Sequence, residues 1–291
     1  MNPPQFTTQN DAPLFPNVLF NRPVTRHAAG RMLLVGGHSH EFSLPTAIHQ
    51  LAMAAGIGEC NVVLPDTLAS LLSGAPGTRF AAANPSGALS REALGRILEL
   101  AEDADAVAVG ASLSNNSDTA MLIERLITGI ERPLIAFDDA LTATQHNAGT
   151  VTGNPDALVI LTMTEVFKLA GRLGIAINIR RGAGLINKLE IIQDLKAATQ
   201  CQFAVYGSEI IVAADTALIV TPISYRLSLV PALFYAVLGT FWLQNRTNQR
   251  AGLATGAWLI HELSRQLDPT GQPSTGWLAA RLDEILRRDE F

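Results

Sequence analysis

The sequence predicts an α/β fold in which a mostly parallel central sheet carries helices on both faces. Short apolar runs, such as RMLLVGG at residues 31–37 and AVAVGAS at 106–112, alternate with amphipathic stretches such as DTAMLIERLITGI at 118–130. Hydrophobic residues make up 48% of the 291 residues and charged residues 16%, which is typical of a chain with a thick interior. Strands that alternate with helices of this length form parallel sheets covered on both faces.

Each predicted strand is a short apolar run bounded by glycine, proline or polar residues. The first run ends in the paired glycines Gly36 and Gly37, and the fourth ends in two carboxylates, Asp138 and Asp139. In chain order, strands are predicted at residues 31–37, 60–66, 106–112, 133–141, 157–162, 202–207, 209–214 and 217–222. Ligands in such sheets bind at the loops beyond the carboxyl ends of the strands.

The predicted helices have apolar residues at every third or fourth position. Gly56 ends the first helix, Ser90 begins the second, and Asn116 or Ser117 begins the third, because small polar side chains favour helix starts. In chain order, helices are predicted at residues 44–56, 91–104, 118–130, 165–174, 186–199, 231–244 and 253–267.

The segment at residues 224–246 contains a charge-free run between two arginines. Its length lies at the lower edge of the range of about 17–25 residues that spans a membrane. A helix buried on all sides is equally apolar, and Pro231 stands where the first turn of a helix tolerates proline. We favour the buried helix over the membrane span, because the neighbouring elements are amphipathic.

The composition of the chain also limits its domain organisation, its cellular location and its binding partners. No linker or repeat divides the chain, so we expect one domain over residues 21–291 after a poorly anchored arm at 1–20. The arm lacks the basic and apolar regions of a signal peptide. Cys60 and Cys201 form no disulfide framework, which favours a cytoplasmic location. The 21 basic residues are scattered over a chain of net charge −5, which argues against a nucleic-acid partner.

The short motifs of common active sites are absent. His38, His40, Glu41 and His49 lie close in sequence, but they divide between a loop and a helix without a cysteine nearby, so we expect no metal site. No GxSxG, phosphate-loop or dinucleotide motif occurs. The paired carboxylates of the FDDA segment are the stronger candidates for function, with capping of the following turn as the alternative.

Several segments in order resemble the motifs of one enzyme family. AVAVGASLS is similar to a GPGLG loop, PLIAFDDAL to PLVLDADAL, LTMTEVFKLAG to TPHPGEFARLLG, and AVYGSEIIVA to VLKGAGTVIA. The stretch GRMLLVGGHSHEF resembles a strand followed by a GGS…Y-[ST]-G-A loop. Over residues 22–267 the chain thus resembles the ADP-dependent NAD(P)H-hydrate dehydratases of the ribokinase-like superfamily. The resemblance implies a ribokinase-like three-layer fold.

The resemblance also implies a chemistry, the removal of water from hydrated NADH or NADPH with ADP or ATP as the nucleotide. The family's GGTGD motif at a helix start supplies an anion hole of backbone N–H groups and an aspartate base. Aligning FYAVLGTFWLQN with the family's LAGIIAALLAQG places this motif on residues 228–232. The base position is then Ala232, and the preceding glycine is Pro231, which has no N–H to donate.

The same alignment implies the remaining site positions. Tyr206 stands where the family has a lysine, and Glu209 replaces a glycine, so we expect Glu209 to add a negative charge to the nucleotide loop. The positions implied for substrate binding are Gly36, Gly37, Pro45, Gly110, Ser112, Asp139 and Glu165. Those implied for nucleotide binding are Tyr206, Gly207, Ser208, Glu209 and Pro231.

We therefore expect a dehydratase-like scaffold with impaired or lost catalysis that binds ADP or ATP weakly or not at all. One alternative is an active dehydratase in which Asp138 or Asp139 acts as the base. The other is a ribokinase-like small-molecule kinase, which needs the same anion hole and base. The resemblance further implies a homo-oligomer, and we expect no membrane partner.

Overall fold

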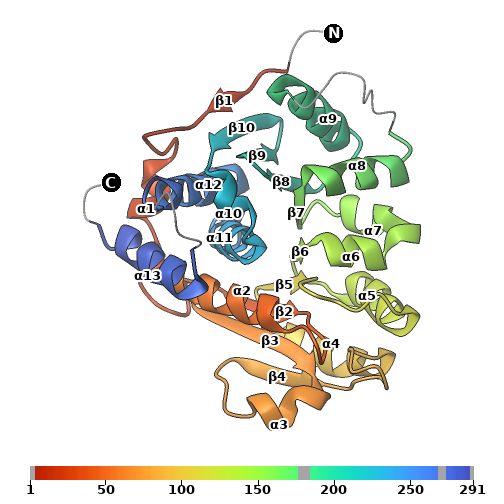
Figure 1. Ribbon diagram of the computed structural model, residues 1–291. Coiled ribbons are helices and arrows are strands. Elements are labelled where there is room, and N and C mark those ends of the chain that lie inside the picture. Colours follow the sequence, from red (N-terminus) through yellow and green to blue (C-terminus); the bar gives the residue numbers. More distant parts are fainter. Residues whose placement is uncertain (1–3, 176–183, 268–272, 289–291) are drawn as a thin grey trace.

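In the part of the chain that the computed structural model describes, residues 4–175, 184–267 and 273–288, ten strands form one sheet. Their order is β1-β10-β9-β8-β7-β6-β5-β2-β3-β4 (Figure 1). All neighbours run parallel except β9, which is antiparallel to β8 and β10. The strands are β1 (Thr7–Thr8), β2 (Arg31–Val35), β3 (Glu59–Pro65), β4 (Thr78–Ala81), β5 (Ala106–Val109), β6 (Leu134–Ala136), β7 (Ala157–Thr162), β8 (Gln202–Tyr206), β9 (Glu209–Ala214) and β10 (Ala217–Pro222).

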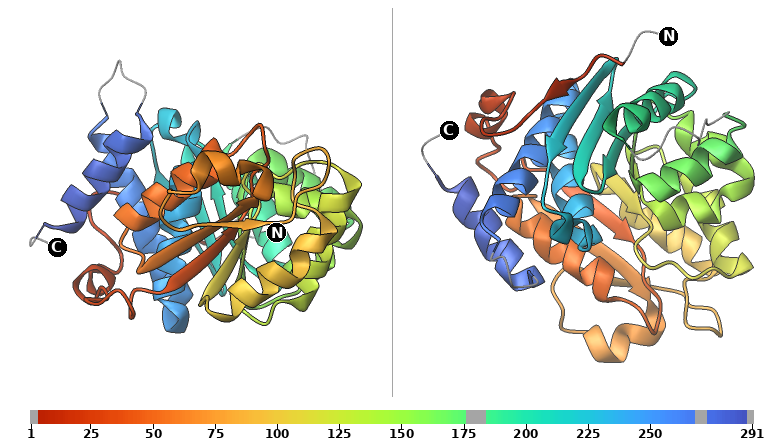
Figure 2. Two further views of the ribbon diagram at one scale, coloured as in Figure 1. Left: turned by 90° about the horizontal axis from the view of Figure 1, so that it is seen from below. Right: turned by 45° about the horizontal axis from the view of Figure 1, so that its top comes forward.

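Helices cover both faces of this sheet (Figures 1 and 2). α2, α11, α12 and α13 lie on one side, and α4, α5, α8 and α9 lie on the other. The helices are α1 (Pro16–Phe20), α2 (Ser43–Ala54), α3 (Ala69–Leu72), α4 (Leu94–Glu102), α5 (Ser117–Gly129), α6 (Asp138–Ala143), α7 (Ala148–Thr152), α8 (Met163–Arg172), α9 (Leu185–Ala197), α10 (Tyr225–Ser228), α11 (Pro231–Gln244), α12 (Gln249–Arg265) and α13 (Thr275–Leu286).

The alternation of side chains along the strands produces two cores. In β2, Met32 and Leu34 belong to the core that includes α2, α11 and α12, whereas Leu33 and Val35 belong to the core that includes α4 and α5. All four side chains are at most 2% exposed. A parallel strand buried on both faces is apolar at every position, which confirms the predicted three-layer α/β architecture.

The prediction for residues 133–141 is wrong in its second half. β6 ends at Ala136, and Asp138 and Asp139 occupy the first turn of α6. Phe137 is the N-cap residue of α6, without a side-chain cap bond. The two carboxylates therefore neither end a strand nor cap the helix, although the positive end of a helix dipole favours negative charge in this turn.

Of Asn116 and Ser90, which the sequence predicts at helix starts, only Asn116 caps a helix with its side chain. Asn116 caps α5, because its side-chain oxygen accepts a hydrogen bond from the Thr119 N–H at 2.8 Å. Ser90 makes no such bond, and its hydroxyl instead donates to the Ala82 carbonyl at 3.1 Å. A 3-10 turn at Arg91–Ala93 precedes α4 there, so the helix begins later than predicted.

The N-terminal arm is anchored, contrary to expectation. β1 pairs in parallel with β10 at the edge of the sheet, and the Gln9 N–H donates to the Val220 carbonyl. The Gln9 side chain is 1% exposed. Its amide nitrogen donates to the Ala254 carbonyl at 2.8 Å, and its oxygen accepts from the Leu14 N–H at 2.8 Å. A buried amide with these partners fixes the arm against α12.

The charge-free run forms α11, the most enclosed helix of the fold. Every residue from 232 to 243 in this 14-residue helix is buried, and its neighbours are α2, α12 and the sheet. The prediction of a buried helix is confirmed. Among the described residues, we find no helix long and apolar enough to cross a bilayer.

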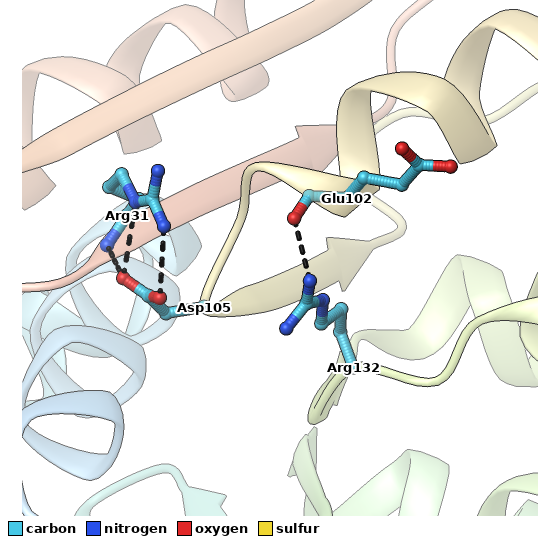
Figure 3. Close-up of polar contacts among 4 residues, drawn as sticks. All are labelled: Arg31, Glu102, Asp105 and Arg132. Atoms are coloured by element: carbon cyan, nitrogen blue, oxygen red, sulfur yellow. Dashed lines mark hydrogen bonds and ion pairs between the residues drawn. The ribbon is translucent and has the colours of Figure 1, made fainter.

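Ion pairs and hydrogen bonds tie the amino edge of the sheet together (Figure 3). The Arg31 guanidinium and backbone N–H both donate to the Asp105 carboxylate, the latter at 2.8 Å. Arg132 donates to the Glu102 carbonyl at 2.6 Å. These contacts lie at the opposite end of the strands from the predicted site.

Candidate functional site

The loops that follow β2 and β5 touch at the carboxyl edge of the sheet. The Gly37 N–H donates to the Ala111 carbonyl at 2.9 Å. A Cβ added at Gly36 would lie 2.2 Å from the Gly110 carbonyl oxygen, so only glycine fits at this approach. A Cβ on Gly37 would lie 3.3 Å from the Pro45 ring. The structure thus brings these predicted substrate-side residues together.

Asp139 holds the loop after β5 in an unfavourable backbone conformation. Ala111 and Ser112 both have φ of 65°, a region that costs about 1–3 kcal/mol for residues other than glycine. The Asp139 carboxylate accepts from the Leu113 N–H at 3.0 Å. Burial raises the pKa of Asp139, and the Leu113 hydrogen bond acts in the opposite direction. Its position therefore supports the loop directly.

Glu165 has a structural task at the start of α8. Its carboxylate accepts from the Thr162 N–H at 2.6 Å, which completes a capping box. Such a box satisfies N–H groups that a helix start otherwise leaves without partners. Burial raises the pKa of Glu165, while the Thr162 N–H lowers it.

Four aromatic rings pack where β6 and β8 end and α11 begins. Tyr206 stacks on Phe234 with ring centroids 4.2 Å apart, and Tyr235 stacks on Phe137 at 4.0 Å. The Tyr206 and Tyr235 hydroxyl oxygens lie 3.4 Å apart, and the two residues are 3% and 5% exposed. We call these four residues the aromatic cluster. They occupy the region where the resemblance places the nucleotide lysine.

The aromatic cluster stays uncharged at neutral pH. Burial raises the pKa of Tyr206 to about 12, and the negative charges of Glu165 and Asp138 add to the rise. The pKa of Tyr235 is raised by burial as well. A phenol has no cationic form, so Tyr206 cannot supply the positive charge of the lysine that the resemblance implies at this position.

The helix start at residues 228–232 offers few free backbone donors. The Leu229 N–H donates to the Arg226 carbonyl at 3.3 Å, and the Val230 N–H donates to the Leu227 carbonyl at 2.9 Å. Pro231, the first residue of α11, has no N–H. Ala232 is 3% exposed and carries no ionisable group. Three consecutive residues thus present no N–H to a ligand.

The negative charge that the sequence predicts at Glu209 lies on a carboxylate with two partners from the same chain. Lys188 of α9 pairs with it, with the ammonium nitrogen 2.5 Å from the Glu209 carboxylate. The Ser208 hydroxyl donates to the other carboxylate oxygen at 2.5 Å. Gly207 and Ser208 form the turn between β8 and β9, and the Ser208 carbonyl accepts from the Ile223 N–H at 3.1 Å. The charge of this loop is therefore balanced locally.

The histidines and cysteines make no site in the described residues. The His38 and His40 rings are 6.2 Å apart at their centroids, and the His49 ring nitrogen lies 2.9 Å from the Cys60 carbonyl oxygen. No group of three metal-ligating side chains occurs within the described ranges. Burial raises the pKa of Cys60 and Cys201 to about 12, so both thiols keep their protons.

Sequence reasoning missed Lys188 and three members of the aromatic cluster, Phe137, Phe234 and Tyr235. Lys188 is one of only three lysines in the chain, and that scarcity was a usable signal. The signal for Tyr235 was weaker: it follows Pro231 by one helical turn and therefore lies at the same end of α11.

No family model matches the chain. Its curated relatives in sequence are bifunctional NAD(P)H-hydrate repair enzymes. The enzyme of Moorella thermoacetica is 31% identical over 134 residues, which is 45% of this chain and 25% of the relative. The enzyme of Salinibacter ruber is 28% identical over 155 residues, 51% of this chain and 29% of the relative. The matches thus span less than a third of these relatives' length.

Solved structures match the chain over nearly its whole length. A ribokinase-like superfamily protein from Enterococcus faecalis has a TM-score of 0.76 and 13% identity, with 96% of this chain and 95% of that chain covered. The ADP/ATP-dependent NAD(P)H-hydrate dehydratase from Bacillus subtilis, crystallised with ATP and magnesium, has a TM-score of 0.64 and 15% identity, with 98% and 100% covered. The chain therefore has a ribokinase-like α/β fold, and its curated relatives in sequence are NAD(P)H-hydrate repair enzymes.

Proposed function

We propose that this chain is an NAD(P)H-hydrate dehydratase-like protein in which nucleotide-dependent dehydration is lost or strongly impaired. The scaffold and the curated relatives support the substrate class, hydrated NADH or NADPH. If the chain turns over, ADP or ATP is the nucleotide, in line with the crystallised dehydratase. A homo-oligomeric state and a cytoplasmic location stay predictions from the sequence.

The helix start at residues 228–232 carries the proposal. An anion hole needs N–H groups that point at the developing charge, and a general base needs an ionisable side chain. Leu229 and Val230 use their N–H groups within the preceding turn, and Pro231 has none. The implied base position is Ala232. The aromatic cluster supports the same reading, because Tyr206 brings no positive charge to this edge.

The two alternatives depend on other groups. An active dehydratase would need Asp138 or Asp139 as the base. The Asp139 carboxylate already accepts a hydrogen bond from the Leu113 N–H. A small-molecule kinase would need the same anion hole as the dehydratase, so the features of residues 228–232 count against both.

The test is a dehydration assay on hydrated NADH with ADP or ATP, followed through the absorbance of restored NADH. A general base contributes about 10²–10⁴ in rate, and one anion-hole donor about 10²–10³. We expect turnover lower by about 10⁴ or more than that of the Bacillus subtilis dehydratase assayed alongside. Comparable rates would overturn the proposal.

Two variants then identify the source of any activity. Loss of turnover in Asp138→Asn or Asp139→Asn would assign the base to that carboxylate. Unchanged turnover in both would mean that the alignment of residues 228–232 is wrong. Ala232→Asp alone should not create activity, because Pro231 still lacks its donor.

A further inference from the structure

A cavity of about 320 Å³ lies at the amino edge of the sheet, at the opposite end of the strands from the candidate functional site. Its walls come from the first residues of β2, β3 and β4 and from the end of α4. Small-molecule sites in proteins have volumes of about 300–1,000 Å³. The cavity is therefore large enough for a small ligand, and it shares no residue with the site around residues 228–232.

Arg79 of β4 lines this cavity without a carboxylate partner in the described part of the chain. Its guanidinium makes one hydrogen bond there, to the Thr78 carbonyl at 3.1 Å, and the residue is partly buried. The second cation of the cavity, Arg31, is already paired with Asp105 at 3.4 Å. A carboxylate with two oxygens fits the planar fork of a guanidinium. Arg79 thus brings unused N–H donors suited to the carboxylate of a ligand.

Two carboxylates line the same cavity. Glu59 of β3 accepts a hydrogen bond from the Asn61 side-chain amide at 2.6 Å. The carboxylate of Asp103, which follows α4, has no hydrogen bond or ion pair within the described ranges. An ammonium group would find acceptors here, whereas a ligand that carries only a carboxylate would meet two like charges. The charges of the cavity therefore favour a zwitterion.

The remaining wall of the cavity is apolar. Leu33 and Ala104 are 2% and 5% exposed. Leu100 of α4 packs against the core that α4 and α5 share. An aliphatic group placed against this wall is removed from water, which favours its binding.

We propose that this cavity is a binding site for an α-amino acid with an aliphatic side chain, such as leucine. The ligand's carboxylate binds the Arg79 guanidinium, and its ammonium group binds Glu59 or Asp103. Its side chain lies against Leu33 and Leu100. The site is independent of the proposed function, because it lies at the opposite edge of the sheet.

Isothermal titration of the full-length protein with leucine should show saturable binding with a Kd below about 1 mM. Two analogues separate the groups of the ligand. Isocaproate keeps the carbon chain and the carboxylate of leucine but lacks the ammonium group. Isoamylamine keeps the chain and the ammonium group but lacks the carboxylate. Each should bind at least about tenfold more weakly than leucine.

Arg79→Gln removes the guanidinium and should weaken leucine binding at least about tenfold. The matched control is Arg132→Gln, which removes one positive charge at the same edge of the sheet, where Arg132 donates to the Glu102 carbonyl (Figure 3). It should bind leucine as the wild type does, because Arg132 does not line the cavity. Arg79→Lys is the second variant if Arg79→Gln fails to fold. It keeps the charge but loses the planar fork, so leucine should again bind more weakly.

Absence of saturable leucine binding at millimolar concentrations would show that the cavity holds water only, and would overturn the inference. So would equal affinities for leucine, isocaproate and isoamylamine, or unchanged leucine binding in folded Arg79→Gln. None of these outcomes touches the proposed function, which the dehydration assay tests separately.

Discussion

Among the described residues, the hydroxyl groups of Tyr206 and Tyr235 have only each other as a hydrogen-bond partner. Their oxygens lie 3.4 Å apart, between rings that stack on Phe234 and Phe137. Removing one hydroxyl leaves the other buried without this partner, which costs about 1–3 kcal/mol. Replacing both removes the unpaired group as well as the bond. The pair should therefore respond non-additively to substitution.

We expect Tyr206→Phe and Tyr235→Phe each to lower the free energy of unfolding by about 1–2 kcal/mol. The double variant should lose less than the sum, with a coupling energy of about 0.5–1.5 kcal/mol. Urea unfolding of the four proteins measures this cycle. Tyr225→Phe is the matched control, because Tyr225 is 67% exposed; its effect should stay within about 0.5 kcal/mol. Strict additivity would show that the two hydroxyls do not interact.

The candidate site illustrates which residues a sequence can place. Gly36 and Gly37 follow an apolar run and precede a helix, a local pattern that predicts a tight turn. Asp139 was placed at the right edge, but its bond to Leu113 joins residues 26 positions apart. The contact between Tyr206 and Tyr235 spans 29 positions. Contacts of this kind depend on how whole elements pack, and no local pattern records them.

At the scale of elements, α11 and α12 pack at close range because α12 carries a glycine at the contact. A Cβ added at Gly252 would lie 2.4 Å from the Phe241 carbonyl oxygen and 2.8 Å from the Asn245 Cβ. The first of these atoms belongs to the backbone and cannot move aside alone. The two helices would have to separate to accept any side chain there.

We therefore expect Gly252→Ala to destabilise the fold by about 1–3 kcal/mol, as overpacking of a core does. Gly276 of α13 is the control, because a Cβ added there meets no atom of the described residues within 4 Å. Gly276→Ala should instead stabilise by up to about 1 kcal/mol through helix propensity. Thermal or urea unfolding compares the two. Equal effects of the same sign would contradict the close packing of α11 on α12.

The elements themselves were predictable to different degrees. ALVILT at residues 157–162 is an apolar run and became β7 with the predicted bounds. β4 and β1 were missed, since Thr78–Ala81 is short and Thr7–Thr8 is polar and exposed. β6 stops at Ala136, and Asp138 and Asp139 begin a helix. The sequence suggested a continued strand because the apolar Leu141 follows Asp139 by two residues. Edge strands and strand ends depend on tertiary partners more than on composition.

At the scale of the molecule, one sheet separates two hydrophobic cores. Every central strand contributes side chains to both, as β2 does through Leu33 and Leu34. The three tryptophans of the chain, Trp242, Trp258 and Trp277, all belong to or pack on the core of α2, α11 and α12. Tryptophan fluorescence therefore reports one core, whereas far-UV circular dichroism reports both.

We expect both signals to follow one unfolding transition in urea, because a shared sheet couples the two cores. This tests the prediction of one domain over residues 21–291. The two curves should give the same midpoint and the same slope. A fluorescence transition at a different urea concentration from the dichroism transition would show that the cores unfold separately.

The pairing of β1 with β10 has a consequence for how the chain folds while it is being synthesised. Gln9 is synthesised before its partner Ala254, which comes 245 positions later in the chain. At about 5–20 residues per second, Gln9 waits on the order of 10–50 seconds for that partner. Until β10 (Ala217–Pro222) is synthesised, the arm has no sheet edge to join. The arm is therefore synthesised before the strand and the helix that hold it, and it takes its place only after both exist.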